Sequence, residues 1–362
     1  MKNIAIVIDS LTGGGAERVM ISLASALIRQ KHSVTLLSLS NRIEYTIPDA
    51  IKVYCLFDHK ATKVDSFWLF NKSLAKLEAW FANEQEQHRK FDLVLSNLDR
   101  SNNLLAKSTI DPVFFIIHNS INEELQRQKK LGPFAYFYLL SSKKNLSGKN
   151  LVCVSKGIQQ EVFKSKLVQS KTLVTIYNPL DLDDIRKRSQ LTNTDIPSTP
   201  YIIHVGRFAK QKRHDILFKA LVLVVPDIKL VLLCNKPQKA LRLAKKYGVE
   251  DRVLVPGFQD NPYNWIKHAE ALVISSDYEG LPTVLLEAIA VNTKVVSTDC
   301  PHGPNEILTG ELNRFLVPRR EPEILAKRIN QAIITNVNLE NTKILEKVHA
   351  EKIAQHYLAL IK

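Results

Sequence analysis

Short apolar runs alternate with longer polar, helix-like segments from the first residues onward. The first run covers residues 4–8, and a glycine turn at 12–15 leads into apolar positions at helical spacing and then a second run at 34–37. This succession is typical of a βαβ unit. Because strands buried on both faces read as continuous apolar runs, residues 1–178 are predicted to form a doubly wound parallel-sheet domain. Its later runs lie at 93–95, 113–117 and 151–154.

The alternation stops near Asn178 and starts afresh at residues 201–206, with polar sequence between them. We therefore place a boundary at 178/179 and predict a second doubly wound domain over residues 179–345. Residues 346–362 are helical in pattern and could pack back on the first domain. The expected fold class is α/β, with two Rossmann-like domains facing a cleft. The second domain's further apolar runs lie at 230–233, 253–255, 271–274, 295–297 and 315–317.

Composition agrees with two globular domains. At 362 residues the chain is too long for one comfortable core, since single cores seldom grow past about 250 to 300 residues. The four cysteines are widely spaced, which supports neither a disulfide framework nor a zinc site. The N-terminus has no signal-peptide core, and no run reaches the roughly 18 apolar residues of a membrane span. A cytoplasmic protein is expected.

The glycine turn from Thr12 to Arg18 follows the first strand and opens the first helix. Ligands of open α/β sheets bind beyond the carboxyl ends of strands, so the bare amides of Gly14 and Gly15 could approach an anionic or sugar group closely. The spacing is not the GxGxxG fingerprint of dinucleotide binders. A tight turn that serves only packing is the alternative.

Two cations follow the strand at residues 201–206. Arg207 comes just past the strand, and Lys212 comes five residues later, near the start of the next helix. Arginine offers a planar fork of donors and lysine a mobile point charge, so the two suit a diphosphate. A solvated basic turn is the alternative.

Two carboxylates, Glu279 and Glu287, follow the strand at residues 271–274. Glu279 lies in a loop, whereas Glu287 lies in a helix predicted over residues 281–290, with Pro282 at or near its first position. On a single helix they would be separated by about 12 Å of rise, more than the roughly 5 to 9.5 Å of a glycosidase pair. We expect them to bind two different hydroxyl-bearing parts of one ligand.

Glu287 has apolar neighbours on both sides in the sequence. Its carboxylate would be costly to bury unless it accepts hydrogen bonds, and a ribose diol would supply them. An internal salt bridge to Arg207 or Lys294 is the alternative.

Taken together, these motifs resemble glycosyltransferase family 4 over nearly the whole chain. The resemblance implies the two-domain fold called GT-B, a nucleotide-sugar donor, retention of anomeric configuration, no bound metal and no further cofactor. The residues that carry it are Arg207-x4-Lys212, Glu279-x7-Glu287 with Gly280 and Pro282 between them, the Gly14-Gly-Ala-Glu-Arg18 stretch, and Pro301-His-Gly-Pro-Asn-Glu306.

The resemblance also implies roles in donor binding. Arg207 and Lys212 would hold the diphosphate, and Glu287 the nucleotide ribose. Glu279, with the amides of Gly280 and Leu281, would hold the sugar and phosphate. The nucleobase would lie near the turn at residues 256–259, which contains Phe258.

In the first domain, His118 ends the strand at residues 113–117 and is similar in placement to the family's histidine that faces the donor sugar. A purely structural histidine is the alternative. Two positions depart from the family's pattern, because Asn292 and Arg314 stand where many members have glycine. Both lie beyond the implied donor contacts and concern local loop shape.

For such an enzyme, catalysis is mainly positioning and electrostatic stabilisation of the departing nucleoside diphosphate. The catalytic set is then Arg207, Lys212, Glu279 and His118. The resemblance suggests a same-face substitution in which the donor's own phosphate helps to deprotonate the acceptor hydroxyl. Residues 298–304 are similar to bacterial surface-polysaccharide enzymes. The expected donor is a UDP-hexose or UDP-N-acetylhexosamine, and the expected acceptor a lipid-linked, lipopolysaccharide or capsule glycan.

Charge adds one more expectation. The net charge is +14, and residues 125–171 hold ten Lys/Arg against one acidic residue, interleaved with the aromatic residues of 134–138. Such a segment could contact an anionic membrane, at the cytoplasmic face of the inner membrane. No nucleic-acid module accompanies it, so no nucleic-acid partner is expected. A solvated helical face is the alternative.

Three rival functions fit parts of the sequence. A sugar-nucleotide epimerase would share the architecture but need no acceptor, and a non-enzymatic carbohydrate-binding protein would release no nucleotide. An NAD-dependent oxidoreductase would leave Arg207, Lys212 and both glutamates unexplained.

Overall fold

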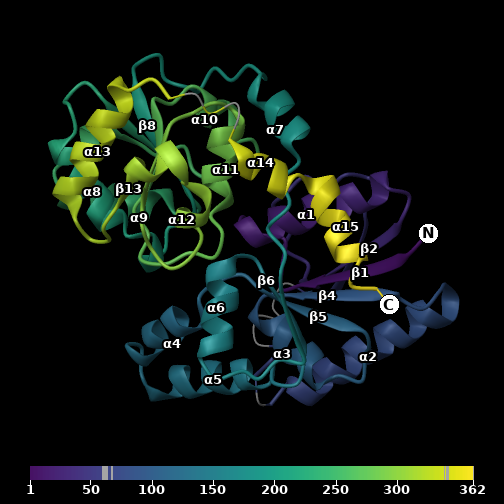
Figure 1. Ribbon diagram of the computed structural model, residues 1–362. Coiled ribbons are helices and arrows are strands. Elements are labelled where there is room, and N and C mark those ends of the chain that lie inside the picture. The colour runs from purple at the N-terminus through teal and green to yellow at the C-terminus, as the bar shows by residue number, and fades with distance from the viewer. Residues whose placement is uncertain (59–63, 67, 338, 340–341, 362) are drawn as a thin grey trace. The chain divides into compact units, whose positions relative to one another are not determined.

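The computed structural model describes residues 1–362 apart from 59–63, 67, 338, 340–341 and 362 (Figure 1). The chain divides into two compact units. Unit 1 comprises Met1–Pro179 and Ala350–Lys362, and unit 2 comprises Leu180–His349. The sequence places these divisions after residues 178 and 345.

Unit 1 is built on a seven-stranded sheet in the order β3-β2-β1-β4-β5-β6-β7, with every neighbouring pair parallel. The central strands β1, β4 and β5 are buried along their whole length, as their continuous apolar runs predict. The strands are β1 Asn3–Ile8, β2 Ser33–Ser40, β3 Lys52–Phe57, β4 Leu93–Asn97, β5 Val113–Ile117, β6 Asn150–Cys153 and β7 Thr172–Thr175.

Helices cover both faces of this sheet (Figure 1). The last helix of the chain, α15, belongs to unit 1 and packs against α1. The helices are α1 Gly15–Arg29, α2 Phe70–Gln87, α3 Asp99–Lys107, α4 Ile121–Lys129, α5 Pro133–Lys144, α6 Lys156–Lys164 and α15 Ala350–Leu358.

Unit 2 repeats the plan with a six-stranded parallel sheet in the order β10-β9-β8-β11-β12-β13. This is the Rossmann strand order, in which the topology reverses between the first and fourth strands, here β8 and β11. The strands are β8 Tyr201–Val205, β9 Lys229–Leu233, β10 Val253–Leu254, β11 Ala271–Ile274, β12 Val295–Thr298 and β13 Leu316–Val317.

In unit 2, α8 and α13 pack together on one face of the sheet, and α10 and α11 lie on the other (Figure 1). The α-helices are α7 Leu182–Ser189, α8 His214–Leu223, α9 Pro237–Lys246, α10 Tyr263–Lys267, α11 Thr283–Ala290, α12 Pro304–Ile307, α13 Pro322–Ile334 and α14 Lys343–Val348. Short 3-10 turns are η1 Lys210–Lys212, η2 Glu250–Arg252 and η3 Gly310–Phe315.

The predicted fold class, two Rossmann-like doubly wound domains, is confirmed. Two details differ from the sequence-based expectation. The C-terminal helix expected over residues 346–362 is α15, Ala350–Leu358, and residues 346–348 belong to the separate helix α14, Lys343–Val348. The helix expected over residues 281–290 begins at Thr283, because Pro282 keeps an extended backbone and forms its N-cap.

Candidate active site

The carboxyl edge of the unit 2 sheet brings the predicted donor-binding segments together. Gly206, at the end of β8, donates its amide to Leu233 O of β9 at 3.0 Å, and Cys234 donates to Gly257 O at 3.1 Å. The turns after β8, β9 and β10 therefore lie side by side. The loop after β11 joins them, since the Asp277 amide donates to Gln211 O at 2.8 Å. Ligands bind at this edge in open α/β sheets, at the topological switch point.

Lys212 and Glu279 form an ion pair at this switch point. Lys212 Nζ lies 2.7 Å from Glu279 Oε1, and the side chains are only 18% and 8% exposed. The Ser276 hydroxyl donates to the same carboxylate oxygen. The backbone of Glu279 is also held, because its amide donates to Pro301 O at 2.7 Å and its carbonyl accepts from the His302 amide at 3.0 Å. The predicted cation and carboxylate thus share one fixed arrangement.

Arg207 and Phe258 present exposed side chains at the same edge. Arg207 lies two residues past β8, and Phe258 lies in the turn beside the end of β9. Arg207 has no ion pair within the described part of the chain. An exposed guanidinium at the carboxyl edge of the sheet is available to an anionic ligand.

Helix α11 starts where the Glu279 loop ends. Gly280 and Leu281 lead into Pro282, and the first helical amides point back toward the loop. Free amides and the macrodipole make such an end favourable for phosphate. Glu287 is buried on this helix. Lys294, its suggested partner, donates to Ile333 O at 2.6 Å.

The Glu279 loop is backed by a glycine that leaves no room for a side chain. A Cβ on Gly303 would lie 2.5 Å from Gly280 O and 2.9 Å from Leu281 Cα, and Gly303 has φ +96°. Both the close approach and the backbone conformation require glycine. Residues 301–303 therefore fix the shape of the loop.

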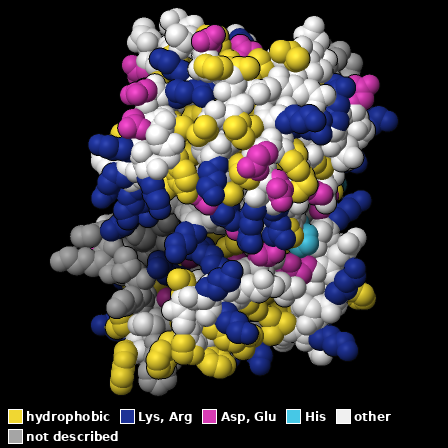
Figure 2. All heavy atoms as spheres, turned by 90° about the vertical axis from the view of Figure 1, so that its left-hand side faces the viewer, with side chains coloured by type: hydrophobic (Ala, Val, Ile, Leu, Met, Phe, Trp, Pro, Cys, Tyr) yellow, Lys and Arg dark blue, Asp and Glu magenta, His cyan; other side chains and the backbone are white. Residues whose placement is uncertain are grey.

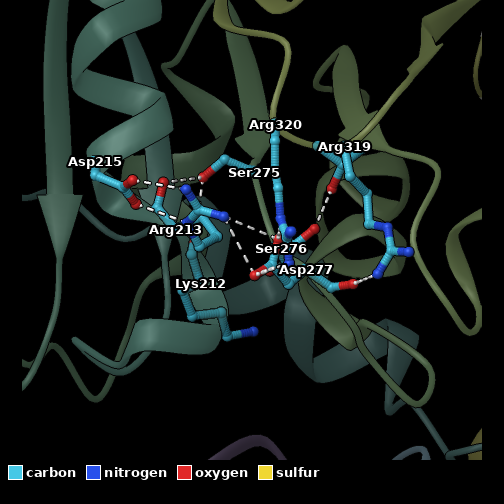
Figure 3. Close-up of polar contacts among 9 residues, drawn as sticks. Lys212, Arg213, Asp215, Ser275, Ser276, Asp277, Arg319 and Arg320 are labelled. Carbon is cyan, nitrogen blue, oxygen red and sulfur yellow. Dashed lines mark hydrogen bonds and ion pairs between the residues drawn. The ribbon is translucent and has the colours of Figure 1, made fainter. Parts of the chain in front are cut away.

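A cluster of arginines and aspartates, which the sequence did not single out, joins the same loops (Figure 3). Arg213 contacts Asp215 and Asp277, and Arg320 contacts Asp277 from the other side. Beside the carboxylates, hydrogen bonds raise the pKa of Arg213, and Arg213 lowers the pKa of Asp215. The only sequence signal was proximity, since Arg213 follows Lys212 and Asp277 precedes Glu279 by two.

Beneath Gly206 lies a buried histidine pair, His204 and His214, with ring centroids 4.9 Å apart. His204 Nδ1 donates to Val273 O at 2.8 Å, so this neutral ring carries its proton on Nδ1. Burial, and then the charge of Lys212, lower the pKa of His204 to about 4. Burial also lowers the pKa of His214. Both rings are uncharged near neutral pH.

In unit 1, the predicted glycines lie at the start of the first helix. Gly14 is the N-cap of α1 and Gly15 its first residue. The Gly14 carbonyl accepts from the buried Tyr45 hydroxyl at 2.9 Å, and Arg18 lies over the Tyr45 ring. A Cβ on Gly14 would collide with the Glu17 carboxylate. The turn is thus closely packed, as the packing alternative requires, and its donor-binding role stays a prediction.

His118 follows β5 in unit 1, and its Nε2 lies 3.0 Å from Asn97 Oδ1 at the end of β4. Burial lowers the pKa of His118 to about 4, with opposing effects from Asp99 and Lys143. His118 is therefore a neutral hydrogen-bonding group near pH 7, and the structure gives no role for it as an acid. Its catalytic role stays a prediction.

Among the described residues, no group of three or more His, Cys, Asp or Glu side chains is placed to hold a metal ion. Nor does any helix in that part of the chain have the length and apolar character needed to cross a membrane.

Two family models match consecutive parts of the sequence. The model described as "Glycosyltransferase Family 4" matches residues 13–184, and that described as "Glycosyl transferases group 1" matches residues 187–347.

Similar proteins agree with these models. An N-acetylgalactosamine-N,N'-diacetylbacillosaminyl-diphospho-undecaprenol 4-alpha-N-acetylgalactosaminyltransferase of Campylobacter jejuni is 28% identical, over 85% of this chain and 83% of its own. The lipopolysaccharide 1,6-galactosyltransferase of Escherichia coli K12 is 24% identical, over 99% of this chain and 97% of its own. The structure of HepE from Anabaena in complex with UDP-glucose shares the fold, with a TM-score of 0.73 and 19% identity over 99% of this chain and 98% of HepE.

Proposed function

We infer the function of this chain from its family, since it belongs to the family 4 glycosyltransferases and its second half matches the group 1 model. We propose that it transfers a hexosyl or N-acetylhexosaminyl residue from a UDP-sugar to a lipid-linked or lipopolysaccharide glycan, with retention of configuration. The observation that carries the proposal is the Lys212–Glu279 ion pair at the switch point of unit 2. A cation and a carboxylate in contact there suit a diphosphate joined to a hydroxyl-rich sugar.

The site can stabilise a departing nucleoside diphosphate without a covalent intermediate. Lys212 and the exposed Arg207 supply positive charge, and the N-terminus of α11 supplies amides aimed at the same region. Ser276 and Lys212 hold the Glu279 carboxylate in place, so this carboxylate is suited to binding sugar hydroxyls. The bond between the anomeric carbon and the phosphate oxygen then breaks, the acceptor hydroxyl oxygen bonds to that carbon on the same face, and the leaving phosphate takes the hydroxyl proton.

The acceptor class is proposed from relatives. The Campylobacter enzyme's name specifies a diphospho-undecaprenol-linked acceptor, and the Escherichia coli enzyme's name specifies lipopolysaccharide. Both acceptors are glycans carried on lipids. The family models are those of glycosyltransferases and give no support to the epimerase or the carbohydrate-binding protein.

A panel of nucleotide sugars, each with and without a bacterial lipid extract, tests the function. We expect UDP release from one UDP-sugar that rises with the extract, together with a new glycolipid whose anomeric proton coupling matches that of the donor. Release that is independent of every acceptor, or an inverted anomer, would contradict the proposal.

We also propose that unit 1 makes peripheral contact with an anionic membrane at the cytoplasmic face of the inner membrane. The α4–α6 region exposes Phe134 (91%), Phe137 (63%) and Phe163 (80%). The lower part of Figure 2 shows hydrophobic side chains among those of Lys and Arg. Nine of the ten basic residues in residues 125–171 are at least partly exposed, whereas Lys143 is buried between Asp99 and Glu124. Each cation near an anionic surface contributes about 1 kcal/mol.

Sedimentation with phosphatidylglycerol vesicles tests the membrane contact. The double change Phe134→Asp with Phe137→Asp should reduce the bound fraction at least fivefold, because it removes apolar insertion and adds like charge. Ile334→Asp is the matched control, since Ile334 of unit 2 is 84% exposed and should not affect binding. Equal binding by all three proteins would exclude this face.

A further inference from the structure

Asp277 stands at the centre of the charged cluster in Figure 3 and is held from two sides. Arg320 approaches with its Nε 2.9 Å from Oδ1 and its Nη2 3.0 Å from Oδ2, a bidentate geometry. Arg213 places its Nη1 3.2 and 3.3 Å from the same two oxygens. The Asp277 side chain is 17% exposed, so this contact is only partly screened by water.

The backbone of Asp277 is fixed as well. Its amide donates to Gln211 O at 2.8 Å, and its carbonyl accepts from Arg319 Nη1 at 2.7 Å. One residue therefore joins three segments: the η1–α8 junction, the loop after β11 and the loop after β13.

Both the backbone conformation and the side chain of Arg213 are constrained. It has φ +49° between η1 and α8, and its other side makes a bidentate contact with Asp215, at 2.9 and 2.7 Å. A left-handed conformation in a residue other than glycine costs about 1 kcal/mol or more and persists only when the surroundings impose it. The side-chain contacts to Asp215 and Asp277 supply that constraint.

The two residues that make this contact are neighbours of the donor-binding pair. Arg213 directly follows Lys212, and Asp277 precedes Glu279 by two residues. In Figure 3 the Lys212 side chain runs away from the Arg213 guanidinium, so the two cations serve different partners. The Arg213–Asp277 contact therefore fixes two stretches of backbone, the one next to Lys212 and the one next to Glu279.

We propose that Asp277 is a positioning residue for donor turnover, which acts through Arg213 and Arg320 to hold the Lys212 and Glu279 side chains in their observed contact. The role in turnover rests on the proposed function. The side chains that pair with one another, Arg213 and Arg320 with Asp215 and Asp277, carry two positive and two negative charges, and Arg319, which donates to the Asp277 carbonyl, adds one positive charge. Displacing catalytic groups by about 1 Å can cost a hundredfold in rate, so such positioning has a large effect on turnover.

The first test needs no substrate. The coupling free energy between Lys212 and Glu279 is measured as a double-mutant cycle, from urea unfolding of Lys212→Gln, Glu279→Gln and the double variant. In an Asp277→Asn background we expect this coupling to fall at least twofold, and in an Asp277→Glu background to recover at least half of the loss. Asp92→Asn is the matched control, because Asp92 also pairs with an arginine and is 18% exposed, but lies in unit 1. Equal coupling in all backgrounds would overturn the proposal.

The second test uses the UDP-sugar that the wild type turns over. Asp277→Asn should lower kcat at least tenfold, whereas Asp92→Asn should not. Removing the carboxylate makes the cluster more positive by one charge, so a purely electrostatic role would lower the donor KM and leave kcat unchanged. That result would overturn the proposal. If the wild type turns over no nucleotide sugar, the proposed function fails, and the coupling measurement still decides whether Asp277 positions the pair.

Discussion

Lys212 and Glu279 lie 67 positions apart in the sequence and meet at 2.7 Å. Their meeting follows from topology, since β8 and β11 are neighbours at the point where the strand order reverses. At the scale of single residues, the site depends on a few side chains whose charge and hydrogen bonds are set by such neighbours. Two predictions concern these residues.

Lys212→Ala should lower kcat about a hundredfold, because it removes a cation placed to stabilise the leaving diphosphate. Arg207→Ala should lower turnover similarly. Both rates are measured by UDP release. Lys210→Ala is the control, since Lys210 is exposed in the same 3-10 turn. Turnover of Lys212→Ala or Arg207→Ala at the wild-type rate would refute the role of that residue.

His204 should make the protein less stable in mild acid. Its folded pKa of about 4 lies below the ordinary value of 6.5, so between these pH values the unfolded chain binds a proton that the folded chain does not. Stability therefore falls as pH falls through this window, by about 2 kcal/mol between pH 7 and pH 5.

Urea titrations at both pH values check this prediction. His204→Asn should lose about 2 kcal/mol less than the wild type on acidification, because asparagine keeps a donor for Val273 O and cannot titrate. His88→Asn is the control at an exposed position. An unchanged pH dependence in His204→Asn would show that His204 is not the cause.

At the scale of elements, the candidate site lies in loops rather than in strands, and the shape of these loops depends on close packing. The loop after β11 is bounded by Gly303 behind and by the N-cap Pro282 ahead. Substitutions of residues that pack against this loop should therefore alter the donor site even though these residues do not contact a ligand.

Gly303→Ala should lower activity at least tenfold, because the new Cβ would lie 2.5 Å from Gly280 O and push the loop from its place. Gly310→Ala is a matched control. Gly310 also has positive φ, but a Cβ there meets nothing within 4 Å, so only about 1 kcal/mol of backbone strain is added. Kinetics and thermal unfolding of both variants separate the two effects, and equal activity would contradict the packing argument.

The sequence predicted most strands of both sheets, because central parallel strands are continuous apolar runs. It did not predict β3 and β7, which are the edge strands of unit 1 and are only partly buried. Many family members have glycine at the position of Asn292, and the backbone there explains why. Asn292 follows α11 with φ +61°, a conformation that favours glycine and that asparagine tolerates. Arg314 needs no such freedom, because it lies within η3 at ordinary φ.

That the candidate residues lie at one edge of the sheet was predictable where they follow strands, as Arg207, Lys212 and Glu279 do. Asp277 and its arginines were not, because Arg320 comes from a loop 43 residues further along and only the folded chain brings it near. Charged residues close to a site in sequence are common, and spacing alone does not reveal which of them pair.

At the scale of the whole molecule, unit 1 is assembled from two distant pieces of chain. Helix α15 buries Ile353, Ala354 and Tyr357, and Glu351 accepts from Arg29 of α1 at 2.6 and 2.9 Å. The chain thus passes through all of unit 2 before it completes unit 1.

Tyr357→Ala should destabilise unit 1 by about 3 kcal/mol, because Tyr357 is 1% exposed and its loss leaves a cavity. Hydrogen exchange should accelerate in α1 and not in α11. Lys352→Ala, at an exposed position of α15, is the control. Protection of α1 that is unchanged in Tyr357→Ala would show that α15 contributes little to unit 1.

The discontinuity of unit 1 also has a consequence during synthesis. A ribosome must add residues 180–349 after the sheet of unit 1 is complete and before α15 appears. At 5 to 20 residues per second this takes roughly 10 to 30 s. Throughout that interval the surface of unit 1 against which Ile353, Ala354 and Tyr357 will be buried is uncovered, and uncovered apolar surface is of the kind that chaperones bind.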